Sequence, residues 1–177
     1  MALRRIGERL EMKVTYQITK YPKVRFSAPF ESGRGTMKIK IEVDNTFERS
    51  PALPPELVPF AVESTWFNGT ANVQTFATAE LLATKIRALY QRSKGRDLFD
   101  LWLGLTRLAV SPNELINAFA PYRPDGITST LAIENLTAKL RRAEFRDDLL
   151  RLAAANPDGY NIDTAGQFII DQLLPLL

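Results

Sequence analysis

The sequence of 177 residues contains no cysteine and no histidine. Without cysteine, the chain forms no disulfides and no thiolate metal site. Without histidine, imidazole acid–base catalysis and most zinc sites are excluded. Any catalysis must therefore use carboxylates, lysine, arginine, tyrosine or hydroxyls, and any metal is expected to be a hard, oxygen-liganded ion such as Mg²⁺.

Long apolar runs are also missing. No stretch approaches the roughly 20 apolar residues of a membrane-spanning helix, and residues 1–9 carry charges without the apolar centre of a secretion signal. We therefore expect a soluble, cytoplasmic protein without a membrane partner. The net charge of +3 supports a local basic patch but excludes a protein that coats nucleic acid through charge alone.

Hydrophobic periodicity divides the chain near residue 78. Before this point, apolar and polar residues alternate as in strands, and a hairpin turn is expected at Asn68-Gly69. After it, the spacing is helical, so the sequence predicts an α+β fold with a β-rich part over 1–77 and a helical part over 78–177. Trp66 and Phe67 are expected in the core. Strands are predicted at 12–19, 24–26, 37–44, 61–67 and 71–77, with a short helix over 1–11 and an irregular proline-rich connection over 48–60.

Several helices are expected in the second part. Ser111 and Glu114 have the spacing of a capping box, which predicts a helix start. Phe145, Leu149 and Leu152 indicate another helix, and a last one is expected over about 163–174. Arg141 and Arg142 close the helix predicted at 129–142. They are compatible with contact to nucleic acid and equally with favourable placement at a helix carboxyl end.

The segment 80–102 carries the most specific pattern in the sequence. Leu82, Ile86 and Leu89 follow one helical face, and Gly95 is predicted to close that helix before a second one begins at Leu98. On the first helix, Lys85 and Arg92 lie two turns apart, or roughly 10 Å.

Acidic residues accompany these cations. Asp97 and Asp100 are neighbours on the second helix, next to the basic run Arg92, Lys94 and Arg96. One interpretation is a solvated helix–turn–helix with ordinary ion pairs. The other is an active site that sets acids beside phosphate-binding cations.

The order of these residues resembles the signature of the AbiEii/AbiGii nucleotidyltransferase-like toxin family. In that family a Lys-x-x-Ala-Leu-x-x-Arg helix runs into Lys-x-Arg-Asp-x-x-Asp-Leu. The matching residues here are Lys85, Ala88, Leu89, Arg92, Lys94, Arg96, Asp97, Asp100 and Leu101.

The predicted strand over 37–44 presents charged residues on one face. An antiparallel strand with its polar side in water explains this pattern, and so does a strand that lines a site for phosphate and metal. Its Lys-Ile-Glu segment resembles a strand of the same family. By that analogy Glu42 is the third catalytic carboxylate and a metal ligand, with Lys40 beside it as a phosphate contact.

The resemblance implies a toxin of a toxin–antitoxin or phage-defence pair, in which the intact enzyme transfers a nucleotidyl group from an NTP, with Mg²⁺, to an acceptor such as tRNA. It further implies a remnant of a mixed nucleotidyltransferase sheet and a cognate antitoxin. Lys85 would contact the triphosphate, and Asp97 would be a catalytic or orienting carboxylate with Asp100 as a second orienting one. Arg92, Lys94 and Arg96 would position phosphate or RNA.

The first catalytic motif of this family is missing. No Gly-Gly, Gly-Ser or Asp-x-Asp occurs in the sequence, and residues 1–11 resemble a helix from the middle of a domain. We therefore expect an amino-terminally truncated protein, either a fragment or a misassigned gene start or a truncated gene, that is inactive or nearly so by itself. Alternatives are a non-catalytic RNA- or protein-binding module left from such a toxin, or a purely structural helix pair.

Overall fold

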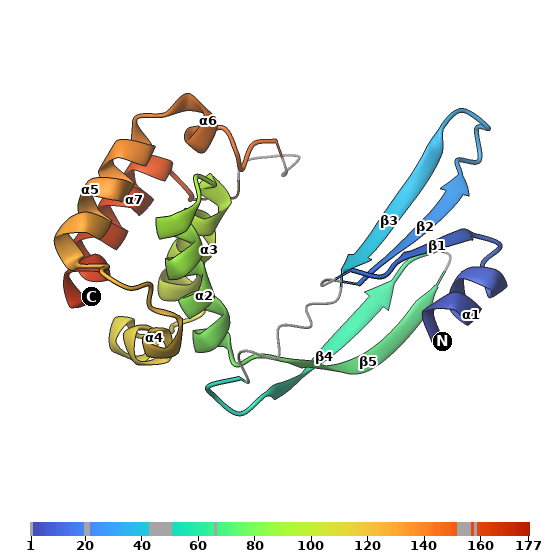
Figure 1. Ribbon diagram of the computed structural model, residues 1–177, viewed down its shortest axis with the longest axis horizontal. Coiled ribbons are helices and arrows are strands. Elements are labelled where there is room, and N and C mark those ends of the chain that lie inside the picture. The colour runs from blue at the N-terminus through green and yellow to red at the C-terminus, as the bar shows by residue number, and fades with distance from the viewer. Residues whose placement is uncertain (1, 20–21, 43–50, 66, 152–156, 158) are drawn as a thin grey trace. The chain divides into compact units, whose positions relative to one another are not determined.

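The computed structural model describes residues 2–19, 22–42, 51–65, 67–151, 157 and 159–177. It confirms the predicted α+β class, with antiparallel strands followed by helices (Figure 1). The chain forms two compact units, Met1–Ser50 and Pro51–Leu177. The compositional boundary at residue 78 coincides instead with the first residue of α2, so the hairpin that precedes this helix belongs to the second compact unit.

The first unit consists of a short helix and a three-stranded antiparallel sheet with the order β1-β2-β3. The predicted strands are confirmed, although Val43 and Asp44 lie outside the described residues. Val24 and Phe26 on the central strand are buried. The helix approaches the sheet so closely that a Cβ at Gly7 would collide with the side chain of Val14. The elements are α1 (Ala2–Arg9), β1 (Lys13–Gln17), β2 (Lys23–Pro29) and β3 (Thr36–Glu42).

The second unit begins with an antiparallel hairpin of β4 (Glu56–Glu63) and β5 (Asn68–Thr75). The prediction of an irregular connection over 48–60 is wrong from Glu56 onward, where β4 contains Pro59. A two-stranded hairpin has only edge strands, and these tolerate a residue without an N–H donor.

The position of the hairpin turn was also predicted wrongly. Asn68 pairs with Glu63 inside the ladder, and the chain reverses just before it, where Ser64 N–H donates to the carbonyl oxygen of Phe67 at 3.1 Å. Phe67 is exposed rather than part of the core, because it belongs to this turn. Trp66 lies outside the described residues.

Six α-helices follow the hairpin among the described residues of the second unit. The capping box is confirmed, since Ser111 Oγ accepts a hydrogen bond from Glu114 N–H at 3.2 Å. The helix expected around Phe145 and Leu149 is only one turn long, and Leu152 lies outside the described residues. The α-helices are α2 (Thr78–Gln91), α3 (Gly95–Thr106), α4 (Pro112–Phe119), α5 (Ser129–Leu140), α6 (Ala143–Arg146) and α7 (Ile162–Gln172), with 3-10 turns at Ala120–Tyr122 and Leu174–Leu176.

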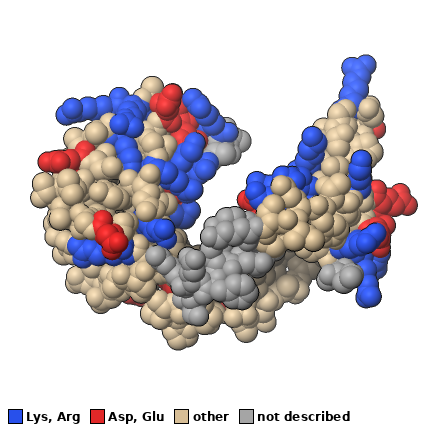
Figure 2. Space-filling model, viewed as in Figure 1, with Lys and Arg blue, Asp and Glu red and all other residues tan. Residues whose placement is uncertain are grey.

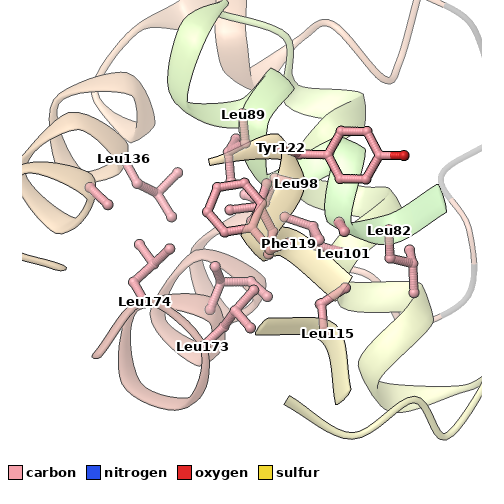
Figure 3. Close-up of a cluster of buried hydrophobic side chains, with 14 of the residues drawn as sticks. Leu82, Leu89, Leu98, Leu101, Leu115, Phe119, Tyr122, Leu136, Leu173 and Leu174 are labelled. Carbon is pink, nitrogen blue, oxygen red and sulfur yellow. The ribbon is translucent and has the colours of Figure 1, made fainter. Parts of the chain in front are cut away.

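These helices enclose a large apolar core (Figure 3). The predicted stripe Leu82, Ile86 and Leu89 of α2 faces it, and Leu98 and Leu101 of α3 are fully buried. At the start of α2, buried Glu80 accepts hydrogen bonds from the N–H groups of Ala52 and Leu53 and from the Tyr122 hydroxyl. Burial opposes ionisation of this carboxyl, but the three hydrogen bonds outweigh it and lower the pKa of Glu80.

Candidate functional site

The junction of α2 and α3 brings together four of the predicted site residues. α2 ends at Gln91, and three residues connect it to α3, with Arg92 and Lys94 in extended conformation. This short connection folds the end of α2 against the first turn of α3. Lys85 and Arg92 thereby meet Asp97 and Asp100, and these four residues are called the α2–α3 cluster below.

Asp97 lies at the centre of the α2–α3 cluster and is fully buried. Arg92 grips its carboxylate with two hydrogen bonds, Nε to Oδ2 and Nη2 to Oδ1, each 2.7 Å long. Lys85 Nζ lies 3.9 Å from Oδ1. The hydrogen bonds that Arg92 donates to Asp97 raise the pKa of Arg92 above its ordinary value. Asp97 therefore orients the cations around it.

Asp100 holds the second cation of the α2–α3 cluster. Its Oδ2 lies 2.7 Å from Lys85 Nζ, and about a third of each side chain is exposed. Asp97 and Asp100 are on the same side of α3, one turn apart. The cluster thus presents an ammonium and a guanidinium close together, each fixed by a carboxylate and each partly open to solvent.

Lys94 is held by an acid that the sequence analysis missed. Its Nζ lies 3.4 Å from Oδ1 of Asp148, which is nearly buried. Asp148 Oδ2 also accepts the backbone N–H of Arg96 at 3.3 Å, so this carboxylate caps the amino end of α3. No local pattern marks Asp148, because its partners lie some fifty positions earlier in the chain.

Gly95 is the first residue of α3 and does not close α2 as predicted. A Cβ at this position would collide with the carbonyl oxygen of Phe145. The glycine is therefore required by the close approach of the α6 backbone.

Lys139 is a buried cation that the sequence analysis did not single out. Its Nζ donates to the carbonyl oxygen of Tyr90 at 2.9 Å and to that of Leu89. These are carbonyls of the last turn of α2, which have no partner within the helix. Burial, and then the charge of Arg142, lower the pKa of Lys139 to about 8. Lys139 thus links α5 by hydrogen bonds to the carboxyl end of α2, directly before Arg92.

Glu42 and Lys40 lie on β3 in the first unit. Glu42 Oε1 pairs with Lys23 at 3.0 Å and with Lys40 at 3.2 Å. The hydrogen bonds from Lys23 and then Lys40 lower the pKa of Glu42. These residues thus form an exposed ion-pair group of their own.

The carboxylates do not fit a Mg²⁺ site by themselves. Among the described residues, no group of three or more acidic side chains is placed to hold a metal ion. The oxygens of Asp97 are engaged by Arg92, and those of Asp100 and Glu42 face lysines.

The chain matches, over residues 2–167, the family described as nucleotidyl transferase AbiEii toxin of a Type IV toxin–antitoxin system. This family match indicates a nucleotidyltransferase-like toxin of a toxin–antitoxin system. Because the match covers most of the chain, the chain belongs to the AbiEii family, and this membership indicates a cognate antitoxin as partner.

Comparison with curated proteins and with solved structures gave no match. None of the described helices combines the length and the apolar character needed to cross a membrane.

Proposed function

We propose that the α2–α3 cluster contacts the phosphates in nucleotidyl transfer from an NTP to an RNA acceptor such as tRNA, a reaction carried out by an intact member of the family. The observation that carries this proposal is the fully buried Asp97, which fixes Arg92 bidentately and lies beside Lys85. Cations fixed before a substrate arrives lose little freedom when they bind phosphate.

Each member of the α2–α3 cluster has a distinct role in this proposal. Lys85 contacts the triphosphate as a point charge, and Asp100 orients it. Arg92 grips phosphate oxygens with its remaining N–H donors, while Asp97 is a positioning residue. Lys94 and Arg96 extend the contact to phosphate or RNA.

Two further parts of the proposal rest on the family resemblance. Glu42 is the third carboxylate and Lys40 its neighbour on the sheet. The Mg²⁺ that the family resemblance implies requires ligands beyond the paired carboxylates described above. Since the sequence contains no Gly-Gly, Gly-Ser or Asp-x-Asp, we expect the 177-residue chain alone to transfer little nucleotide.

Binding and transfer are measured separately to test this function. Each labelled NTP is titrated into the chain with Mg²⁺, and incorporation into purified tRNA is followed in parallel. Lys85→Met should weaken NTP binding about tenfold, the loss of one charge-assisted contact. Arg87→Met is the matched control, because Arg87 also lies on α2 but bonds to Gln91 rather than to an acid. Equal affinity of the two variants would refute the role of Lys85, and robust transfer by the wild-type chain would refute the expected inactivity.

A second candidate function is a non-catalytic RNA-binding module. Both carboxylate oxygens of Asp97 accept hydrogen bonds from Arg92. This observation favours the module, because it explains the buried acid by a structural role alone. Asp97→Asn and Lys94→Ala separate the two functions. If Asp97→Asn strengthens RNA binding and no NTP binds to the wild-type chain, the module is the correct description.

A further inference from the structure

The cations closest to the α2–α3 junction are largely neutralised within the protein. Lys85 pairs with Asp100, Arg92 with Asp97, and Lys94 with Asp148. An ion pair presents little net charge to a distant polyanion. The long-range attraction for RNA must therefore come from cations without such partners.

Three arginines in this region satisfy that condition. Arg96 on α3 is partly exposed, and Arg141 and Arg142 at the end of α5 are exposed. Within the part of the chain that the structure describes, none of their side chains forms an ion pair.

Lys139 positions the two arginines that follow α5 close to the α2–α3 junction. Its hydrogen bonds to the carbonyls of Leu89 and Tyr90 fix the last turn of α5 on the last turn of α2. Arg142 follows at once, and its backbone N–H donates to the carbonyl of Lys139 at 2.9 Å. The charge of Arg142 also contributes to the lowered pKa of Lys139, as expected for a guanidinium close to that amine.

Figure 2 shows Lys and Arg side chains gathered over the part of the second unit where Figure 1 places α6 and the junction of α2 and α3. α5 packs on α2, and packed helices lie about 8–10 Å apart. The two arginines after α5 and Arg96 at the start of α3 therefore present a spread array of charge near the junction. Such an array suits the repeated phosphates of an RNA strand better than one compact anion.

We propose that Arg96, Arg141 and Arg142 form a contact surface for the phosphate backbone of RNA, with Arg96 at the start of α3 and the other two directly after α5. This surface rests on the proposed function in taking RNA as the acceptor. The contacts go to phosphates, so they set affinity and register without selecting a base sequence. Arg141 and Arg142 near the carboxyl end of α5 also interact favourably with the dipole of that helix. Their effect on stability is therefore measured separately from their effect on RNA binding.

The test measures the affinity of the full chain for a fluorescently labelled tRNA mixture across a salt series. Arg142→Ala should weaken binding about tenfold at 0.1 M salt and reduce the salt slope by about one, as expected for one lost phosphate contact. Arg141→Ala/Arg142→Ala should show about twice the change in slope. Arg142→Lys should restore most of the affinity, because a phosphate contact needs only the charge.

The matched control is Arg107→Ala. Arg107 is also an exposed arginine at a helix end in the second unit, but it lies at the other end of the 12-residue α3, roughly 18 Å from the junction. Thermal melting of each variant checks that the fold is kept. Glu144→Gln, which removes an exposed acid near Arg142 in the chain, should tighten binding.

Two results would refute the proposal that these arginines form an RNA-binding surface. The first is equal RNA affinity of Arg142→Ala and Arg107→Ala, with only stability altered, which would leave the helix dipole as the sole role. The second is a loss of NTP affinity in Arg142→Ala as large as its loss of RNA affinity, which would show that Arg142 binds a nucleotide rather than the RNA backbone. If instead no NTP binds but the arginine variants lose RNA affinity, the surface stands and nucleotidyl transfer fails.

Discussion

At the scale of single residues, Asp97 is the side chain on which the α2–α3 cluster depends. It is fully buried and accepts two charge-assisted hydrogen bonds from Arg92. We predict that Asp97→Asn lowers the free energy of unfolding by about 1.5–3 kcal/mol, the usual range for hydrogen bonds to charged groups. Asp100→Asn, which removes an ion pair whose side chains are each about one third exposed, should cost less than about 1 kcal/mol. Urea unfolding of both variants measures the difference, and equal costs would contradict the central place of Asp97.

Lys139 gives a prediction about pH. Its pKa is lowered to about 8 in the folded chain, against about 10.4 when unfolded. Between these values the unfolded state binds more protons, so the free energy of unfolding rises with pH. The penalty for burying the charge is thus fully present below pH 8 and is relieved as the pH rises toward 10.4.

The comparison of wild type with Lys139→Met isolates this effect. From pH 7.5 to 9.5, the stability of wild type relative to the variant should increase by on the order of 1 kcal/mol. Groups common to both proteins cancel in the difference. A stability difference that stays constant over this range, or falls, would show that Lys139 keeps its ordinary pKa.

At the scale of elements, the packing of α3 depends on a glycine. We predict that Gly95→Ala destabilises the protein by about 1–3 kcal/mol, because the new methyl group meets the backbone oxygen of Phe145. Gly104→Ala on the same helix is the control, since its methyl group meets the side chain of Leu82, which can move. Thermal melting compares the two, and a smaller loss for Gly95→Ala would contradict this account of the junction.

The sequence alone predicts those helices and residue pairs that depend on neighbouring positions in the chain. The spacing of Leu82, Ile86 and Leu89 predicts α2, and the spacing of Asp97 and Asp100 predicts that both face the same neighbour. Contacts between distant segments could not be predicted in this way. Asp148 and Lys139 reach the junction from about fifty residues away, and the role of Gly95 depends on Phe145.

At the scale of the whole molecule, the two compact units differ in how much apolar surface they bury. The large core is drawn from Leu53 and from residues 79–177, whereas Val24 and Phe26 are the buried apolar side chains among the described residues of the first unit. A domain of about 50 residues with so small a core is marginal by itself.

We therefore predict that residues 51–177 fold alone and that residues 1–50 do not. The longer fragment should keep its helical circular dichroism and melt cooperatively, while the shorter one should show no cooperative transition. Loss of cooperative melting in the longer fragment would show that its core needs the first unit.

The central claim is that the cations at the α2–α3 junction bind nucleotide phosphate. The most direct test is an NMR titration of the isotope-labelled chain with each NTP, following the backbone amides and the arginine Nε signals. The account predicts the largest shifts at Arg92 Nε–H and at the amides of residues 92–97. The absence of shifts there, with shifts confined to residues outside the junction, would contradict it.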